Sequence, residues 1–452
     1  MLTAVYLRNN LILPIKTRPE KSLYNQTNFI GSRCILAGNE TTIQEKTGLR
    51  WQETFAALNH YNYRLWFIGQ VVSLVGTWMQ STAQGYLIYQ ITKSPAYLGL
   101  VGFFGGVPTL LFTLFGGVVA DRLPRRKLLV ITQTSMMILA FILAALTFTN
   151  TVRPWHIIVL AFLLGVANAF DAPARTSFVL ELTDRTTMTN AIALNSTMFN
   201  IATVVGPSVA GLTYAAIGPA WCFTLNGLSF IAVIIALLLM RIKLEAKPAR
   251  RAAALAELGE GIRYVLRNRM IISLIGSVGI VSIFGIGMMN LLPAWAVDIL
   301  HGDVTTNGWL VSARGFGSLV SALMLAYWGT RKLRGRLWTV GAFVMPVMLF
   351  IFAWLRWLPL SLVTLLGVGW GFMMVTNNSQ AIVQSLVPDH LRGRVMGVYT
   401  LIFFGSMPLG SLLAGALAQG FGEPPTVMLG AGLLMLLAIL AWIFLPDIRR
   451  QH

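Results

Sequence analysis

Twelve apolar stretches, each long enough for a helix to cross a bilayer, follow one another along this chain. Only 11% of the residues are charged, against about 25% in soluble domains, so a water-soluble globular enzyme is excluded. The sequence therefore predicts an all-α polytopic membrane protein with twelve transmembrane helices. Their expected ranges are 64–90, 95–120, 127–149, 155–175, 190–216, 219–241, 269–297, 305–329, 336–355, 358–384, 394–419 and 424–446.

The basic residues predict how these helices are oriented. Nearly all of the 34 Lys and Arg lie in the amino-terminal tail, at the carboxyl end and in the loops after every second span. The loops on the other side hold only Lys93, Arg153 and Arg356. Because Lys and Arg are retained on the cytoplasmic side, both termini are expected in the cytoplasm of a multi-pass protein of the cell (inner) membrane. The net charge of +18 is attributed to this topology, and no nucleic-acid partner is expected.

The two halves of the chain resemble each other. The matched features are LGVANAF (164–170) with LGVGWGF (366–372), RLPRRK (122–127) with RKLRGR (331–336), and Gly99 with Gly308. Matching motifs in matching places indicate a duplication, which predicts two pseudo-symmetric six-helix bundles able to rock about a midplane cavity. The expected layout is a disordered cytoplasmic tail with an interfacial helix at 1–60, bundles at 61–242 and 269–447, and a cytoplasmic linker at 243–268.

The segment GGVVADRLPRRK (116–127) joins the second and third spans. Its glycines, Gly116 and Gly117, allow helices to approach closely, and Asp121 can accept hydrogen bonds from a helix N-terminus or an arginine. The basic run that follows can anchor the loop beside anionic lipid. We interpret the segment as a latch between bundles, although for Arg126 and Lys127 a topology-setting role is an alternative.

GGVVADRLPRRK resembles the signature loop of the major facilitator superfamily, and the 6+6 layout agrees with that resemblance. Four further segments are similar to its enterobactin-exporter-like branch: GQVVSLVGTWMQ (69–80), DAPAR (171–175), NAIALNS (190–196) and RGRVMG (392–397). The resemblance implies an efflux carrier for siderophores, macrolides or other amphipathic compounds, which it exchanges for protons.

The segment GPSVAG (206–211) resembles the antiporter motif of such exporters. Pro207 removes a backbone donor and Gly206 and Gly211 permit close packing, so the motif marks either a functional bend or a plain packing kink. Two departures weaken the assignment of proton coupling. The arginine that drug–proton antiporters carry four residues before a glycine of the fourth span is Ala161 here, and the first-span aspartate of many branch members is Thr77.

Charged residues near the cytoplasmic ends of the spans form the predicted gate. Asp171 and Arg175 are spaced to pair on one helix face, either as a structural gate pair or with a proton or substrate role, and Asp171 is the candidate coupling residue. The gate is predicted to comprise Gly117, Asp121, Arg122, Arg125, Arg126, Asp171, Arg175 and Arg394.

Polar residues inside the spans form the predicted cavity. Arg314 lies deep in the eighth span, where a lone cation normally faces a cavity or a partner; either it meets an anionic or polar group of a substrate, or it pairs with a carbonyl or Asp298. The first span carries a polar stripe on one helical face, which lines the cavity or meets another helix. The proposed lining is Gln70, Ser73, Thr77, Gln80, Gln84, Asn290, Arg314, Asn377, Asn378 and Gln380.

These features predict a secondary active exporter, with no enzyme activity, no cofactor and no metal site. No phosphate-binding G-x-x-x-x-G-K-[ST] loop is present, and the five histidines are isolated. The expected partners are a small amphipathic substrate, protons and the lipid bilayer, and a monomer is expected. Two alternatives remain: a lysophospholipid flippase of the same fold, and a membrane sensor that transports nothing.

Overall fold

The computed structural model describes residues 55–184, 186–241, 254–328 and 333–449, all within one compact unit, Arg50–His452. The side chains of residues 114, 121, 254–256, 326, 328 and 449 are not described. The predicted tail at 1–50 and residues 51–54 of the predicted interfacial helix lie outside the described residues. The part of that helix that is described forms a short turn, η1 (Ala56–Asn59), directly before the first long helix.

Every regular element of the described residues is helical, as the sequence predicts. The first six long helices are α2 (Tyr61–Thr92), α3 (Pro95–Arg122), α4 (Arg125–Phe148), α5 (Pro154–Val179), α6 (Met188–Ile217) and α7 (Pro219–Leu239). After α8 (Ala254–Arg267) comes one interrupted segment made of α9 (Arg269–Val281), η2 (Ser282–Ile286), α10 (Gly287–Met289), α11 (Leu292–Ala294) and η3 (Trp295–Ile299). The last are α12 (Val304–Trp328), α13 (Arg334–Trp354), α14 (Leu358–Leu386), α15 (Asp389–Phe421), α16 (Glu423–Phe444) and the short α17 (Pro446–Arg449).

Eleven of the twelve predicted spans are long and apolar enough to cross a membrane, counting the interrupted segment Arg269–Ile299 as one. The helix that falls short is α2, although its 32 residues would extend about 48 Å at 1.5 Å per residue. Its polar stripe, which includes the buried Gln70, Gln80 and Gln84, lowers its hydropathy. A helix of this length with buried polar groups is expected inside a protein bundle, because lipid cannot satisfy such groups.

The turns between helices repeat in the two halves of the chain. Gly218, between α6 and α7, has φ of 94°, and Gly422, between α15 and α16, has φ of 83°. A glycine with positive φ ends a helix without strain, and a proline lies in the first turn of the next helix, at its first residue in α7 (Pro219) and its second in α16 (Pro424), where its missing N–H is harmless. The same residues therefore make the same corner twice.

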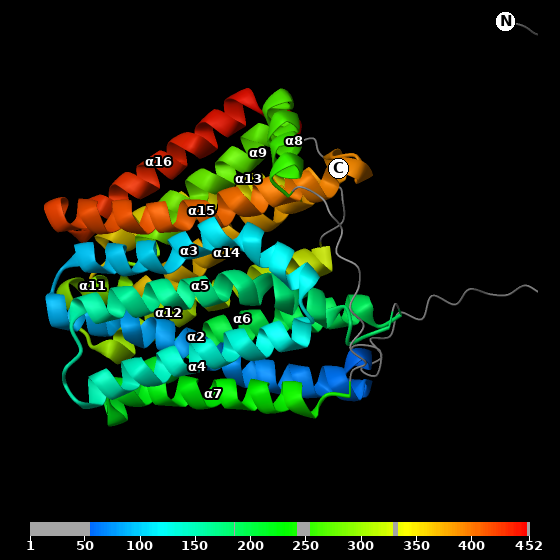
Figure 1. The fold of residues 1–452 in the computed structure, drawn as a ribbon. Coiled ribbons are helices and arrows are strands. Elements are labelled where there is room, and N and C mark those ends of the chain that lie inside the picture. Colours follow the sequence, from blue (N-terminus) through cyan, green and yellow to red (C-terminus); the bar gives the residue numbers. More distant parts are fainter. Residues whose placement is uncertain (1–54, 185, 242–253, 329–332, 450–452) are drawn as a thin grey trace, which may run out of the picture. The chain divides into compact units, whose positions relative to one another are not determined.

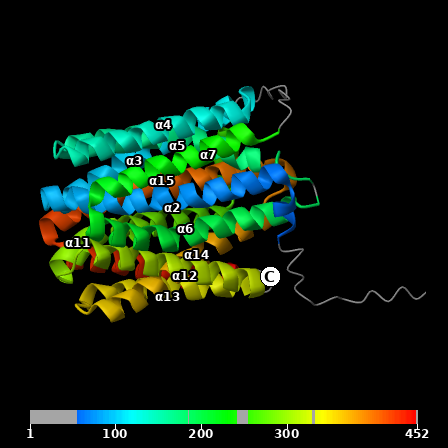
Figure 2. The ribbon, with the colours of Figure 1, turned by 90° about the horizontal axis from the view of Figure 1, so that it is seen from below.

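The described helices pack as two sets, which we call the amino-terminal bundle (α2–α7) and the carboxy-terminal bundle (α9–α16). The largest hydrophobic core draws all of its residues from 265–448, whereas another lies within 57–240. The bundles meet along two helix pairs, α3 beside α15 and α6 beside α12 (Figures 1 and 2). We call the end with the loops at 122–125, 180–188 and 387–389 the basic end, and the other the opposite end.

The first of these contacts is a close approach of backbones between α3 and α15. A Cβ atom added to Gly99 would lie 2.7 Å from the Ser411 carbonyl oxygen and 3.0 Å from the Gly415 Cα. One added to Gly106, nearer the middle of α3, would lie 2.3 Å from Pro408 Cγ. Only glycine permits this separation of the two helices.

The contact between α6 and α12 repeats the same arrangement. A Cβ atom added to Gly308 would lie 2.6 Å from the Pro207 carbonyl oxygen and 3.2 Å from the Gly211 Cα. One added to Gly315 would lie 2.5 Å from the Thr203 carbonyl oxygen. Gly99 and Gly308, which were matched between the two halves of the sequence, thus each permit one close contact between the bundles. We call these two contacts the glycine seams.

Hydrogen bonds between the bundles lie along the glycine seams and at the opposite end. They join Tyr89 to Asp298, Ser94 to Gln419 (2.5 Å), Ser208 to Ser312 (2.7 Å) and Ser312 to the Val204 carbonyl oxygen (2.6 Å). These contacts extend from the opposite end to about the middle of α3 and α12. The structure therefore has its opposite end closed by contacts between the bundles.

We expect Gly99→Val to destabilise the protein, because the added atoms force the seam apart. Overpacking of this kind costs about 1–3 kcal/mol, so the thermal unfolding midpoint of the detergent-purified protein should fall, and Gly308→Val should lower it similarly. Gly432→Val is the control, since a Cβ there meets no atom within 4 Å. An unchanged midpoint for Gly99→Val would contradict this description of the seam.

Candidate functional site

The seventh predicted span is not a regular α-helix. Two of its stretches, Ser282–Ile286 and Trp295–Ile299, are π-helical, and a turn at 290–291 separates two single-turn helices. Inserted π turns and interrupted helices are frequent at the functional sites of membrane transporters. The Asn290 side chain, from that turn, donates to the Ser411 hydroxyl of α15, so this predicted cavity residue holds the interrupted helix against the glycine seam.

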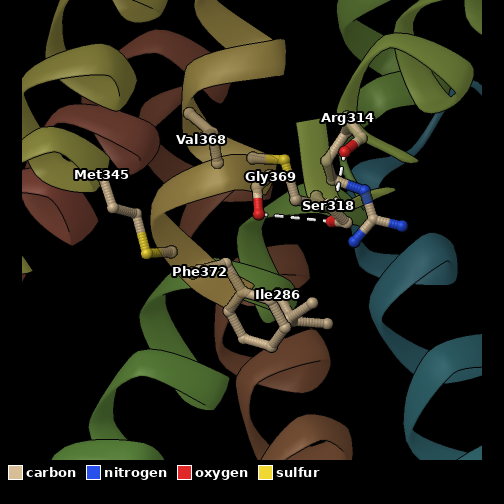
Figure 3. A pocket seen from close by; sticks show the side chains of 9 residues that line it. Ile286, Arg314, Ser318, Met345, Val368, Gly369 and Phe372 are labelled. Atoms are coloured by element: carbon tan, nitrogen blue, oxygen red, sulfur yellow. Dashed lines mark hydrogen bonds between the residues drawn. The ribbon is translucent and has the colours of Figure 1, made fainter. Parts of the chain in front are cut away.

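Arg314 borders a small, largely apolar pocket in the carboxy-terminal bundle (Figure 3). Ligand pockets usually enclose about 300–1,000 Å³, whereas this space holds about one water molecule, so in this structure it is too small to hold a group of a cargo molecule. Its lining includes Ile286 of η2, Met345 of α13 and Phe372 of α14. Ser318 Oγ donates to the Arg314 and Gly369 carbonyl oxygens at 3.2 Å each, which ties α12 to α14.

The Arg314 guanidinium has no ion-pair partner among the described residues. Its Nε is buried and makes no hydrogen bond there. Asp298, the alternative partner that the sequence suggested, instead accepts a hydrogen bond from Tyr89. Figure 3 shows the side chain pointing away from Met345 and Phe372, toward a blue helix of the amino-terminal bundle. Arg314 therefore presents an unpaired positive charge at the middle of α12, next to the seam.

The position equivalent to Arg314 in the other bundle is Gly105. A Cβ atom added to Gly369 would lie 2.0 Å from the Arg314 carbonyl oxygen, and one added to Gly165 would lie 2.3 Å from the Gly105 carbonyl oxygen. Gly165 thus corresponds to Gly369 and not to Gly367, so the sequence match of the two LGV segments is wrong by two residues. Ala161 lies 3.8 Å from a Cβ on Gly105.

The polar stripe of α2 is buried, but part of it faces another helix. Gln80 accepts a hydrogen bond from Asn226 Nδ2 of α7 at 2.7 Å, which is a contact inside the amino-terminal bundle. Thr77 is half-buried, and its hydroxyl donates to the Ser73 carbonyl oxygen. Gln70 is buried with its Nε2 unpartnered, so it remains able to bind a polar group.

The amides of α14 point in different directions. Asn378 is fully buried and donates to the Met374 carbonyl oxygen at 2.7 Å, leaving its Oδ1 unpartnered. Asn377 is half-buried and Gln380 is exposed. These three predicted cavity residues therefore do not form one cluster.

Asp171 is buried between α4 and α5. Its Oδ1 accepts hydrogen bonds from Thr132 Oγ1 at 2.8 Å and Gln133 Nε2 at 2.9 Å. Arg175 Nε lies 3.7 Å from its Oδ2, so the pair that the sequence predicted is present. All of these partners belong to the amino-terminal bundle. Sequence analysis missed Thr132 and Gln133, because only the folded chain brings α4 against Asp171.

The remaining gate residues also contact their own bundles in this structure. Arg125 pairs with Glu181, and Arg126 donates to the Leu238 carbonyl oxygen at the end of α7 at 2.8 Å. Arg122 is exposed. Of the two loop glycines, Gly116 packs on the Ala169 carbonyl oxygen, whereas a Cβ on Gly117 would meet nothing within 4 Å. The Asp121 side chain lies outside the described residues.

Arg394 of α15 pairs with Glu260 of α8 at 2.5 Å. A Cβ atom on Gly261 would lie 2.6 Å from the Arg394 carbonyl oxygen, so α8 packs directly on α15. Sequence analysis missed Glu260, because the linker gave no signal beyond its polarity.

The 206–211 segment lies within a continuous α-helix, α6. Gly206 packs on α2, where an added Cβ would lie 2.5 Å from Trp78 Cβ. The Pro207 carbonyl and Gly211 face α12 in the glycine seam. The segment therefore lets α6 approach two helices, one in each bundle.

Comparison with known proteins identifies the family. Residues 52–450 match the model of the transmembrane secretion effector family of the major facilitator superfamily. The chain belongs to this family. It is 28% identical to the multidrug efflux pump Tap of Mycolicibacterium fortuitum, over 80% of this chain and 90% of that protein. It is 26% identical to the staphyloferrin A transporter of Staphylococcus aureus, over 79% and 90% of the two chains.

The fold is that of other major facilitator proteins. The crystal structure of the nucleoside transporter NupG superposes with a TM-score of 0.69 at 14% identity, covering 84% of this chain and 97% of that one. The chain is therefore a multi-pass membrane transporter of the small-molecule exporting class and not an enzyme, as the sequence predicted.

We expect Asp171→Ala to destabilise the amino-terminal bundle, because the buried Gln133 amide loses its acceptor and Thr132 keeps only the Leu129 carbonyl oxygen. An unsatisfied buried donor costs about 1–3 kcal/mol, so the thermal unfolding midpoint should fall, and Asp171→Asn, which keeps one carbonyl oxygen, should lower it less. Asp184→Ala serves as the control, since that side chain is 79% exposed. Equal midpoints for Asp171→Ala and the wild type would refute this role.

Proposed function

We propose that this protein exports a small amphipathic molecule that carries an anionic group, in exchange for protons, across the inner membrane. The observation that carries the proposal is the unpaired Arg314 beside an apolar pocket at the middle of α12. The aliphatic and aromatic lining would contact an apolar part of the cargo once the pocket widens as the bundles move, and the guanidinium attracts a carboxylate, phosphate or catecholate oxygen. Because an unpaired cation at this depth in the membrane is energetically costly, an anionic ligand that pairs with it gains binding free energy.

Alternating access follows from the two glycine seams. With both termini in the cytoplasm, the basic end faces the cytoplasm, and the closed opposite end faces outward. Cargo would then enter from the basic end and reach Gln70 of α2 and Arg314 of α12. Separation of the seams would open the opposite end and release it. A monomer is sufficient, because both seams are formed within one chain.

The proposed gate closes the basic end in the alternate state. Its residues in the 116–127 segment would then meet the beginning of α15, so Arg394 would exchange Glu260 for a partner in the other bundle. Arg122 is exposed and available for such a contact. The ion pairs now made by Arg125, Arg175 and Arg394 keep these charges partnered in the present state, which would limit the free-energy cost of switching.

Asp171 is the proposed coupling residue. It is a buried carboxylate whose hydrogen bonds connect α4 and α5, and its partner Arg175 is half-exposed toward the basic end. Protonation removes the attraction to Arg175 but leaves an oxygen to accept from Thr132 and Gln133. A proton would therefore release Arg175 for the gate without unfolding the bundle.

We expect Arg314→Ala to reduce export of an anionic cargo far more than export of its neutral analogue. A hydrogen bond to a charged group contributes about 1.5–3 kcal/mol, which corresponds to roughly a tenfold to hundredfold loss. The measurement is uptake into inside-out vesicles of an amphipathic carboxylic acid and its methyl ester. Arg336→Ala removes an exposed arginine as control. Equal effects on acid and ester would contradict the anionic substrate, and transfer of labelled lysophospholipid alone would favour a lipid carrier.

Asp171→Asn is expected to leave the protein folded but to abolish the response of export to a pH gradient. The measurement is vesicle uptake with and without a protonophore, with the unfolding midpoint recorded to confirm folding. Asp184→Asn, an exposed carboxylate, should keep the full response. If Asp171→Asn also keeps it, coupling resides elsewhere and Asp171 only connects α4 to α5.

A further inference from the structure

The linker helix α8 crosses the ends of the membrane-spanning helices. Figure 1 shows it running across α9 and α15, with which it is in contact, whereas those helices run along the bundle. Only Asn268 separates α8 from α9, and its side chain caps α9 by accepting from the Ile271 amide at 3.3 Å. Because α9 begins a transmembrane segment, α8 lies at the level where that segment leaves the bilayer.

One face of α8 is fixed to the carboxy-terminal bundle. Val265 is buried in the core of that bundle, and Leu258 packs against the same core. Gly261 lies directly on the α15 backbone at Arg394, and Glu260 adds the ion pair to that arginine. The orientation of α8 about its own axis is therefore set by its contact with α15.

The face that this contact leaves exposed carries two kinds of residue at helical spacing. Ile262 and Leu266 are 39% and 64% exposed and lie one turn apart. Arg263 and Arg267 lie beside them, also one turn apart, and both are exposed. In the described part of the chain neither arginine makes an ion pair. Paired apolar and basic stripes on a helix in the plane of the membrane surface are typical of interfacial helices.

We propose that the exposed face of α8 binds anionic phospholipid headgroups. Arg263 and Arg267 would contact the phosphates, because basic side chains near a membrane surface are attracted to anionic lipid. Ile262 and Leu266 would enter the adjoining acyl region. Nearby Arg269, at the start of α9, is also exposed and extends the basic surface. The bilayer is favoured as the occupant because α8 is continuous with a membrane-spanning segment and matches the lipid charge.

This binding site would influence α15 directly. Because Gly261 and Glu260 attach α8 to α15, a headgroup that holds α8 at the surface also holds the end of α15, whose other end forms a glycine seam. The contact is independent of the cargo, so this inference stands whether or not the proposed substrate is correct.

The test places a fluorescent label on α8 of the full-length protein in proteoliposomes. Leu266→Cys is introduced in a Cys34→Ser background, since Cys222 is buried, and phosphatidylglycerol or phosphatidylcholine carrying a shallow spin-label quencher is added. We expect strong quenching in phosphatidylglycerol vesicles and its loss when Arg263 and Arg267 are replaced by Gln, but not by Lys. A label at Gly432→Cys, within the bilayer on α16, should report equal quenching in all variants.

Equal quenching at position 266 in both lipids, unchanged by the Gln substitutions, would refute an anionic-lipid site. Shielding of the label that persists in detergent and disappears when residues 1–50 are removed would also refute it, because the face would then be covered by the amino-terminal segment.

Discussion

The close backbone contact at the glycine seams is the constraint on which the rest of this structure depends. At Gly99 and Gly308 the helices approach so closely that a single added carbon would collide with a carbonyl oxygen. In a membrane, small residues of this kind replace the hydrophobic effect as the basis of helix association. The seams contain few polar contacts, so they can separate and re-form without leaving charged side chains unpaired. That property suits a transporter whose bundles rock against each other.

Duplication explains the seams, and the departure from duplication locates the proposed site. The backbones of Gly105 and Arg314 are held in the same way, by Gly165 and Gly369, yet only one of the two positions carries a charge. The first bundle has Gly105 with the uncharged Ala161 beside it. Of these two equivalent positions, the charged one, Arg314, is therefore in the carboxy-terminal bundle, next to the interrupted helix and its π turns.

The apolar runs predicted the spans, because a bilayer fixes helix length and removes alternatives, although α2 is less apolar than the others and the interruptions of the seventh span were not predicted. The largest shifts are at α15, which begins at Asp389 rather than 394, and at α5, which ends at Val179 rather than 175. Partners were harder to predict. The stripe on α2 indicated a polar face, but that Gln80 meets Asn226 depends on how α7 packs. Arg394 meets Glu260, 134 residues away, and no pattern in the linker indicates this. The transporter class was recognisable because its motifs are local, whereas the pairing of gate and cavity residues remains a prediction.

The central claim is that the opposite end must open for export, and a cross-link across it tests this most directly. Ser94 and Gln419 lie on different bundles with their side chains 2.5 Å apart, so Ser94→Cys and Gln419→Cys, in a Cys34→Ser background, can be joined by a short bifunctional thiol reagent. The cross-linked protein should bind cargo but not export it, and cleavage of the linker should restore export. Undiminished export by the fully cross-linked protein would contradict the account.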